Sequence, residues 1–462
     1  MCPLSAPTRT HFKPDILAGL AKTGPRYTSY PTADRLHEGF GARQWSQALS
    51  ARGGQQALSL YVHIPFCDSV CYYCACNKVV TRHHERAARY IAALTREMAM
   101  QAELLGGRAM VTQLHFGGGT PTFLSDAELA GVMAEIRRHF HLASSAEISI
   151  EIDPRTIDAG RLKHLAALGF NRLSYGVQDF EPAVQQAIHR VQPYEAVRDL
   201  MQAAREVGFP SINVDLIYGL PRQTAASFAR TIDQVNALRP DRIALYAYAH
   251  LPTRFKPQRR IVVEELPDPA TRVALLAAAI EGFMDQGYVY IGMDHFALPQ
   301  DSLARARGEG SLHRNFQGYT TEPDRDLLGL GVSAISQVGR VYSQNYKDID
   351  AYYAAMDAGV LPVERGLACT DEDLWRRQLI MDIMCRGRVD LAAASGQANV
   401  EQVFAQELPQ LRQLQAMGLV QLADDGCLSV TEQGWFFVRA IAMVFDAHLR
   451  ASATTQRFSR IA

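Results

Sequence analysis

The chain has 462 residues, of which 48% are hydrophobic and 21% are charged, and its formal net charge is −1. This composition is typical of a globular protein with more than one domain, and the near-neutral charge gives no reason to expect nucleic acid or an anionic membrane as a partner. No apolar run is long enough to span a bilayer and the first residues do not resemble a signal peptide, so we expect a cytoplasmic protein.

The first 55 residues are predicted to form an N-terminal arm. Within it, the run Pro25-Arg-Tyr-Thr-Ser-Tyr-Pro-Thr-Ala33 combines prolines and tyrosines without helical periodicity. Proline restricts its own φ angle and removes a hydrogen-bond donor, so we expect an ordered, extended segment here rather than a helix.

The next part of the chain, to about residue 249, alternates short runs of branched and aromatic residues with amphipathic stretches. The runs predict strands at Leu58–Ile64, Val111–Phe116, Glu147–Ile152, Arg172–Val177, Ile212–Ile217 and Ile243–Ala247. The amphipathic stretches predict helices at Glu85–Ala102, Asp126–Phe140, Ala159–Leu168, Tyr194–Val207 and Ala225–Leu238, with Ser125 and Asp158 in N-cap positions. This alternation indicates an α/β fold in which six parallel strands, joined by right-handed crossovers, form an incomplete (β/α)6 barrel or an open sheet.

The loop after the first predicted strand carries the most informative residues. Cys67, Cys71 and Cys74 have the spacing CxxxCxxC, which lets three thiolates on one short loop reach three irons of a [4Fe–4S] cluster. The fourth iron is then free of protein ligands and can bind a substrate or a cofactor. Because the first strand leads directly into this loop, we expect the cluster at the carboxyl edge of the sheet, where α/β folds place their active sites.

Three other uses of these cysteines fit the sequence less well than an open cluster. A disulfide framework is disfavoured because eight cysteines in 462 residues are sparse, and zinc is disfavoured because no second Cys or Cys/His pair follows at a suitable distance. As a fourth ligand, Cys76 would close the cluster and make the protein an electron carrier. Ferredoxins use a different spacing, and the side chains of a CxC pair in an extended segment point the same way, so we favour the open cluster.

Polar residues stand at or just after the ends of several later strands. Glu151, Gln178 and Asp215 can therefore point into one mouth of the barrel, where carboxylate and amide groups suit ribose hydroxyls and cationic groups. The run from Gly117 to Thr120 follows the second predicted strand and would let the backbone approach a ligand closely. Taken singly, each of these residues is more often a capping or turn residue.

The second half of the chain has a less regular pattern. Residues 250–368 are predicted to elaborate the mouth of the barrel, so the catalytic domain is expected to span residues 56–368. Residues 369–462 are predicted to form a mainly helical C-terminal domain with a hairpin at Leu419–Val430, as in a winged helix. Because the overall charge is nearly neutral, we expect this domain to pack over the catalytic core rather than to bind DNA.

These motifs together resemble the radical S-adenosylmethionine (SAM) enzymes, and most closely their oxygen-independent coproporphyrinogen III oxidase (dehydrogenase) branch. The resemblance covers nearly the whole chain. It is carried by the cysteine loop with Cys76, Gly117-Gly-Gly-Thr-Pro-Thr122, Glu151-Ile-Asp-Pro-Arg155, Gly176-Val-Gln-Asp-Phe180, Asp215-Leu-Ile-Tyr-Gly-Leu-Pro221, Asn315-Phe-Gln-Gly-Tyr319 and the Tyr-Thr-Ser-Tyr-Pro-Thr arm. The cysteine loop is shared by the whole superfamily, whereas the arm and the segment around Asn315 indicate this branch of it.

The resemblance implies two cofactors, a [4Fe–4S] cluster held by Cys67, Cys71 and Cys74, and SAM, bound as two molecules. One SAM would chelate the open iron, and its cleavage would release a 5′-deoxyadenosyl radical. The cofactor-binding residues implied by the family's motifs are Tyr61, Tyr73, Gly118, Gly119, Thr120, Glu151, Gln178, Arg190, Asp215, Ala249 and Ile335. Among them, Tyr73 would contact the adenine and Arg190 would face a carboxylate.

The implied reaction is the oxidative decarboxylation of two propionates of coproporphyrinogen III to vinyl groups, which gives protoporphyrinogen IX in haem biosynthesis. Its implied partners are the substrate, an electron donor for the cluster and an electron acceptor that the sequence does not identify, with the protein itself a monomer. Arg26 and Arg314 are candidate partners for the substrate carboxylates.

Two relatives with other activities were considered. A haem-binding or haem-transfer relative without oxidase activity would typically lack both the arm and the segment around Asn315, and this chain has both. A radical enzyme that modifies tRNA would usually carry a basic face, which the near-neutral charge argues against.

Overall fold

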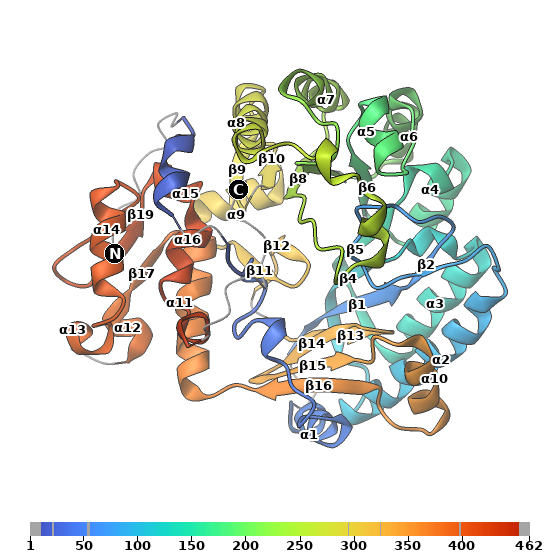
Figure 1. The fold of residues 1–462 in the computed structure, drawn as a ribbon. Coiled ribbons are helices and arrows are strands. Elements are labelled where there is room, and N and C mark those ends of the chain that lie inside the picture. Colours follow the sequence, from blue (N-terminus) through green and yellow to red (C-terminus); the bar gives the residue numbers. More distant parts are fainter. Residues whose placement is uncertain are drawn as a thin grey trace.

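The computed structural model describes residues 11–20, 23–52, 56–293, 295–323, 325–396 and 399–451. Over these residues the central sheet has twelve strands in the order β16-β15-β14-β13-β1-β4-β5-β6-β7-β8-β10-β9 (Figure 1). The six predicted strands lie side by side and parallel in its middle, as β1 (Leu58–Ile64), β4 (Met110–Gly118), β5 (His141–Ile152), β6 (Arg172–Gln178), β7 (Ser211–Tyr218) and β8 (Arg242–Ala247). The predicted incomplete parallel barrel is thereby confirmed.

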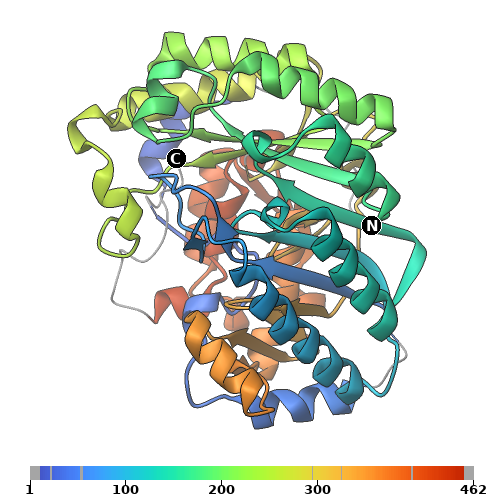
Figure 2. The same ribbon diagram turned by 90° about the vertical axis from the view of Figure 1, so that its right-hand side faces the viewer.

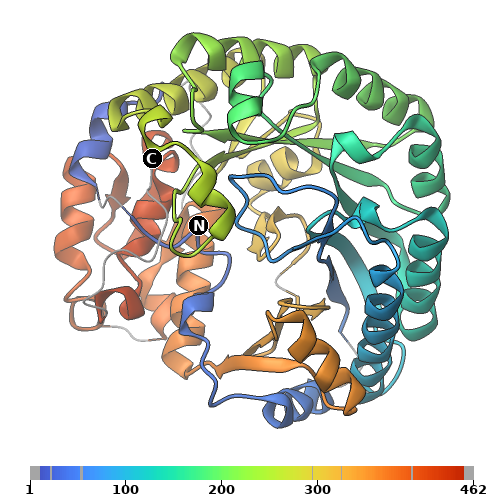
Figure 3. The same ribbon diagram turned by 45° about the vertical axis from the view of Figure 1, so that its right-hand side comes forward.

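The predicted helices cover the outside of this barrel and form a ring around the strands (Figures 2 and 3). They are α2 (Arg86–Leu104), α3 (Asp126–His139), α4 (Ala159–Ala167), α6 (Tyr194–Val207) and α7 (Ala225–Leu238), with a short α5 (Pro182–Ala187) between α4 and α6. Ser125 and Glu128 form a capping box at the start of α3, and the Asp158 side chain caps α4, so both predicted N-caps are confirmed.

Alternation along the strands separates an apolar layer from a polar interior. On β1, Leu60, Val62 and Ile64 are fully buried in the hydrophobic core. The intervening Tyr61 lies on the opposite face, where its ring stacks on that of His115 from β4 at a centroid distance of 5.9 Å. Because side chains alternate between the faces of a strand, the same pattern repeats on β5, β6 and β7 and lines the barrel with polar groups.

The chain after residue 250 is more regular than we expected. It adds β13 (Leu327–Leu330), parallel to β1, followed by the antiparallel strands β14 (Ile335–Val338), β15 (Val341–Asn345) and β16 (Val363–Ala368). At the other edge it adds β9 (Val289–Gly292) and β10 (His295–Ala297), with helices α8 (Pro269–Asp285), α9 (Ser302–Glu309) and α10 (Ile349–Asp357). These strands are only three to six residues long, too short for periodicity to reveal them.

The C-terminal region packs beside the barrel (Figure 1). It contains α11 (Asp371–Arg386), α12 (Leu391–Ser395), α13 (Val400–Val403), α14 (Leu408–Ala416), α15 (Glu432–Trp435), α16 (Val438–Met443) and α17 (Ala447–Arg450). The predicted hairpin is present as β18 (Val420–Leu422) and β19 (Cys427–Val430), joined by β17 (Arg388–Asp390) into one small antiparallel sheet. The domain limits at residues 55 and 368 stay a prediction.

The N-terminal arm runs along the C-terminal region before α1 (Ala42–Arg52). Its extended part is held by side-chain hydrogen bonds: the Tyr27 hydroxyl donates to Asp446 at 2.9 Å, and Arg439 Nε donates to the Pro25 carbonyl at 2.9 Å. Further along, the Ala447 amide donates to the Tyr30 hydroxyl at 3.2 Å. The two ends of the chain's described part therefore stabilise one another. In the described residues, no helix combines the length and hydrophobicity needed to cross a membrane.

Candidate active site

The cysteine loop lies at the carboxyl edge of β1, where it was predicted. Its ends are joined by a short parallel pairing of β2 (Phe66–Cys67) with β3 (Val79–Val80), in which the Thr81 amide donates to the Cys67 carbonyl at 2.9 Å. The loop closes one side of a cavity of about 280 Å³. This cavity is lined by Cys67, Cys71, Cys74 and Cys76 from the loop and by Gly118, Gly119, Thr120, Glu151, Asp153, Arg155, Ser174, Gln178, Arg190, Asp215 and Tyr246 from the strand ends.

Hydrogen-bond donors reach two of the three predicted ligands, while burial raises the pKa of the Cys67 thiol to about 12. Thr120 Oγ1 donates to Cys67 Sγ at 3.4 Å, and the guanidinium groups of Arg155 and Arg190 donate to Cys71 Sγ at 3.6 and 3.5 Å. Hydrogen bonds and positive charge near sulfur stabilise its anionic form and tune a bound cluster. Across the described ranges, no three His, Cys, Asp or Glu side chains come close enough to share one metal ion. The donor set of three cysteine sulfurs on one loop fits an iron–sulfur site.

Cys76 lies beside the predicted ligands, exposed at the edge of the same cavity. Its thiol hydrogen-bonds to Cys74, which lowers the pKa of the Cys74 thiol to about 6 and raises that of Cys76 well above its usual value. Lys78 Nζ donates to the carbonyl of Cys74 at 3.3 Å. Cys76 therefore lies in hydrogen-bonding contact with the predicted ligand Cys74.

The glycine run at the end of β4 is required by close packing. A Cβ atom on Gly119 would lie 2.5 Å from the Pro65 carbonyl oxygen of the cysteine loop, and one on Gly118 would lie 2.8 Å from the His63 ring. Gly118 also has a φ of +118°, which side-chain-bearing residues rarely adopt. The Gly118 amide donates to Glu151 Oε2 at 3.2 Å. These glycines let the end of β4 touch both the cysteine loop and the carboxylate.

A buried ion-pair network contacts Cys71. Asp153, just after β5, accepts from Arg155 at 2.6 Å and from Arg190 Nη1 at 3.0 Å, while the rest of the Arg190 guanidinium donates to the Gly176 carbonyl. Burial opposes ionisation of Asp153, but the hydrogen bonds from Arg155 and the charge of Arg190 hold the pKa of this carboxyl below its ordinary value. Arg190 thus faces a carboxylate of the protein, and it fixes the position of the Cys71 loop.

The three predicted strand-end residues meet at this cavity. Asp215 on β7 accepts from Ser174 Oγ at 3.1 Å and from Asn213 Nδ2 at 2.9 Å, and burial together with the nearby charge of Glu151 raises its pKa to about 6. Gln178 ends β6 with a φ of +70°, an uncommon conformation for a residue other than glycine. Such strain is found at sites where surrounding structure holds a side chain in a required direction.

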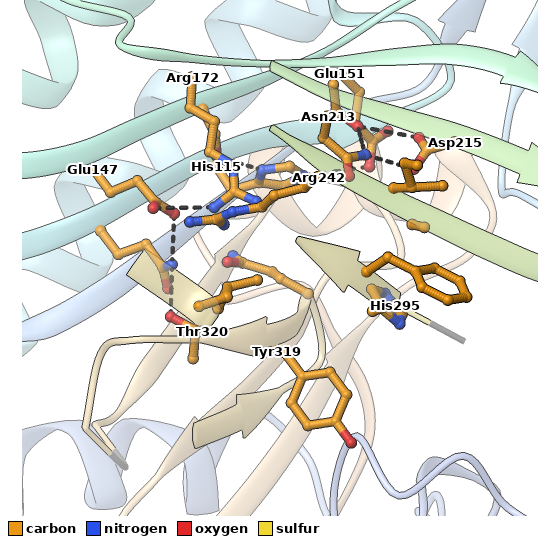
Figure 4. Close-up of a pocket in the computed structure, with 18 of the residues that line it drawn as sticks. His115, Glu147, Glu151, Arg172, Asn213, Asp215, Arg242, His295, Tyr319 and Thr320 are labelled. Atoms are coloured by element: carbon orange, nitrogen blue, oxygen red, sulfur yellow. Dashed lines mark hydrogen bonds and ion pairs between the residues drawn. The ribbon is translucent and has the colours of Figure 1, made fainter. Parts of the chain in front are cut away.

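A second, narrower cavity of about 110 Å³ continues into the barrel (Figure 4). Part of its polar lining is paired internally: Arg172 with Glu147 at 3.0 Å, and His115 with Ser149 at 2.6 Å. Glu151, Ser174, Asp215 and Tyr246 line both cavities. The polar interior of the barrel is therefore continuous with the pocket beside the cysteine loop.

Of the remaining predicted cofactor residues, one lines the loop cavity and the others lie outside the two cavity linings. Tyr73 lines the loop cavity, and its carbonyl accepts from Gln258 at 3.0 Å. Tyr61 is on β1, where its hydroxyl hydrogen-bonds to His63 at 3.1 Å. Ala249 follows β8 and Ile335 begins β14, and neither is among the residues that line the two cavities. Their predicted contacts with a cofactor stay predictions.

Several cavity residues were not predicted from the sequence. Asp153 and Arg155 belong to the motif that starts at Glu151, and this motif was the signal that could have found them. Ser174 and Tyr246 lie in β6 and β8 at positions that face the barrel interior. The two-residue alternation of those strands could have identified Ser174, two residues before Gly176 and four before Gln178.

Comparison with known proteins gives consistent matches along the chain. The radical SAM superfamily model matches residues 61–235, and the HemN C-terminal domain model matches residues 369–437. Curated proteins named oxygen-independent coproporphyrinogen III oxidase are 48% identical to the chain, one from Pseudomonas aeruginosa (97% of this chain, 98% of the relative) and one from Escherichia coli (95% and 96%). A solved structure described as coproporphyrinogen III oxidase (HemN) from Escherichia coli, a radical SAM enzyme, superposes with a TM-score of 0.88 at 47% identity, over 92% of this chain and 97% of that chain.

Proposed function

Because the chain belongs to the family of oxygen-independent coproporphyrinogen III oxidases within the radical SAM superfamily, we propose that it oxidatively decarboxylates two propionates of coproporphyrinogen III. The product is protoporphyrinogen IX, and the reaction belongs to haem biosynthesis. The enzyme is an oxidoreductase whose cofactors are a [4Fe–4S] cluster and SAM. The observation that carries this proposal is the meeting of the cysteine loop with Glu151, Gln178 and Asp215 around one cavity.

When bound, the cluster and SAM supply a 5′-deoxyadenosyl radical that removes a hydrogen atom from the β-carbon of a propionate. Cys67, Cys71 and Cys74 hold the cluster. Thr120 and Arg190 donate hydrogen bonds to two of these sulfur atoms and stabilise their anionic form.

The strand-end residues bind and orient SAM. Asp215 and Glu151 bring negative charge to the cavity, which suits the sulfonium and ammonium groups of SAM. The Gln178 amide reaches the same space with donor and acceptor groups for ribose hydroxyls. Tyr73 contacts the adenine at the loop end of the cavity, next to Cys74. Gln178, Arg190, Asp215, Ala249 and Ile335 together serve the two paired SAM molecules.

The barrel keeps the reacting groups away from bulk water. The arm crosses from the C-terminal region toward the mouth, and the hairpin of β11 (His313–Asn315) and β12 (Gly318–Thr320) contributes Gln317, Tyr319 and Thr320 to the inner cavity. Exclusion of water and oxygen protects a radical from side reactions. The enzyme works as a cytoplasmic monomer with an external electron donor for its cluster and a separate electron acceptor.

The test is an anaerobic assay of the reconstituted protein with a reductant, SAM and coproporphyrinogen III. Substrate-dependent formation of both 5′-deoxyadenosine and protoporphyrin, measured by chromatography after oxidation, is expected. Cys71→Ser is the matched variant and should form neither product. Deoxyadenosine without protoporphyrin, from protein with a full cluster, would refute the substrate assignment.

The haem-binding alternative is not favoured, because the named oxidases match the chain over nearly its whole length. It predicts tight binding of haem together with no decarboxylation. Protein with a full cluster that binds haem and forms neither product would support it.

A further inference from the structure

Three side chains, of which Arg314 is buried and the other two are partly buried, have buried donor atoms that are left unpaired. They are Arg26 through Nη2, Arg314 through Nε and Nη1, and Gln317 through Nε2, none of which has a hydrogen-bond partner in the described parts of the chain. The Arg314 side chain is only 7% exposed. Buried polar groups are almost always hydrogen-bonded, and a buried charge without a partner is costly.

These groups come from two distant segments that meet at the same place. Arg26 is on the arm, with its guanidinium 5.4 Å from the ring centre of Tyr246, and Arg314 is on β11, 4.5 Å from the ring centre of Tyr319. Tyr246 lines both cavities, and Gln317 and Tyr319 line the inner one. Gln317 therefore borders the inner cavity directly, whereas Arg26 and Arg314 lie against two tyrosine rings that line the cavities.

The charges of the two arginines act on each other and on His295. Burial lowers the pKa of Arg314, and the charge of Arg26 lowers it further. Burial and the charges of both arginines also lower the pKa of His295 to about 3, so this imidazole is neutral and adds no positive charge. Over the residues that the structure describes, neither arginine forms an ion pair with an acidic side chain. Two like charges held together by the fold need an anion to neutralise them.

The chemistry of the unpaired atoms specifies which anion. All of them are N–H donors, and a guanidinium presents its donors in a planar fork that matches a carboxylate. The amide of Gln317 adds a neutral donor in the same region. We propose that Arg26, Arg314 and Gln317 form the subsite that binds the propionate carboxylates of the substrate that do not react. This inference rests on the proposed function and names the residues that select its tetra-acid substrate.

The reacting propionates are unsuitable occupants of this subsite. Decarboxylation converts a carboxylate into neutral CO2, so an arginine paired with that group would stabilise the starting state more than the transition state. A carboxylate that survives the reaction keeps its ion pair throughout. Binding energy from such a remote group holds the reacting propionate toward the radical without opposing its loss of CO2.

The subsite also explains why the arm is fixed to the C-terminal region. Arg439 binds the carbonyl of Pro25 and Asp446 binds the hydroxyl of Tyr27, so both neighbours of Arg26 are anchored. Tyr27 has a φ of +46°, a conformation that costs energy in a residue other than glycine. The C-terminal region thus positions one of the two charges that complete the site.

The experiment measures binding of coproporphyrin III, the oxidised and stable form of the substrate, to the cluster-loaded protein by fluorescence titration. Arg26→Gln and Arg314→Gln are each expected to weaken binding about 10- to 100-fold, the usual effect of losing hydrogen bonds to a charged group. Arg89→Gln is the control, because Arg89 is an exposed arginine on α2 that also lies over a tyrosine ring, that of Tyr353 on α10 at 4.3 Å, but lines neither cavity. Both its affinity for coproporphyrin III and its SAM cleavage without substrate should equal those of the parent.

Two further ligands distinguish the outcomes. Protoporphyrin IX keeps only the two propionates that do not react, and its binding should weaken by the same factor as that of coproporphyrin III. If only coproporphyrin III is affected, the arginines hold the reacting groups and the inference is wrong. Coproporphyrin III tetramethyl ester should bind poorly to the parent protein. Equal binding of ester and acid would overturn the inference even if an arginine variant failed to fold.

Failure of the subsite and failure of the proposed function give different results. If the parent binds coproporphyrin III and both arginine variants bind it equally well, only the subsite is refuted. If the parent itself binds no coproporphyrin III while its cluster is intact, the proposed substrate is refuted, and the subsite with it.

Discussion

Asp215→Asn is the most informative substitution, because the structure gives both a sign and a magnitude for its effect. Burial and the charge of Glu151 raise the pKa of Asp215 from 3.8 to about 6. Above pH 6 the carboxyl is ionised in both the folded and the unfolded chain, and the shift then costs the folded protein about 3 kcal/mol. Below pH 4 it is protonated in both, and the cost disappears.

A cationic ligand offsets this cost only when Asp215 is ionised. At pH 7.5 nearly all of an acid with a pKa of about 6 is ionised, and at pH 5.5 only about one quarter is. The contribution of Asp215 to SAM affinity should therefore fall about fourfold between these pH values. The asparagine side chain has a similar shape but no charge. The affinity of this variant for SAM should therefore lack the contribution of the ionised carboxylate.

The assay is equilibrium binding of SAM to the anaerobically reconstituted protein at pH 7.5, 6.5 and 5.5. The amino group of SAM titrates near pH 8, so the measured quantity is the ratio of parent to variant affinity. We expect the ratio to be about 10 or more at pH 7.5 and to shrink about fourfold by pH 5.5. Asp199→Asn, at an exposed ion pair, is the control. A ratio that does not change with pH, while cluster absorbance is constant, would refute the reasoning.

Three other predictions follow from the loop, the glycine run and the arm. Cys74→Ser should abolish the cluster by removing an iron ligand, whereas Cys76→Ser should keep its absorbance and iron content; equal loss in both would support a closed cluster. Gly119→Ala should impair cluster incorporation, measured as iron per chain, because its Cβ would collide with loop backbone, whereas Gly131→Ala has open space and should not. Tyr27→Phe should cost about 1 kcal/mol and make the arm more sensitive to proteolysis, and an unchanged cleavage rate would contradict the anchoring role.

Much of the central barrel could be predicted from the sequence because its signals are local. Two helices, Tyr194–Val207 and Ala225–Leu238, have the predicted bounds, since apolar spacing and caps specify where such a segment begins and ends. By contrast, β5 begins at His141 rather than at Glu147. Its first residues mix polar and apolar types without a regular alternation, and they pair with the start of β4.

The candidate site likewise has some features that the sequence predicts and others that only the fold reveals. The spacing of Cys67, Cys71 and Cys74 predicts a cluster because all three lie on one loop, and strand-end polar residues can be read from the alternation. The Asp153–Arg190 ion pair cannot be read from spacing, because it joins residues 37 positions apart through a turn that only the fold brings back.

The sequence by itself determined the fold class, the cluster motif and the family, because each depends on residues close together in the chain. Only the tertiary structure decided what surrounds the reacting groups. It brought Arg26 from the arm next to Arg314 from β11, 288 positions later in the sequence, and left their donors unpaired at the mouth of the barrel. Electrostatic contact between distant segments depends on packing, and packing is a property of the whole chain.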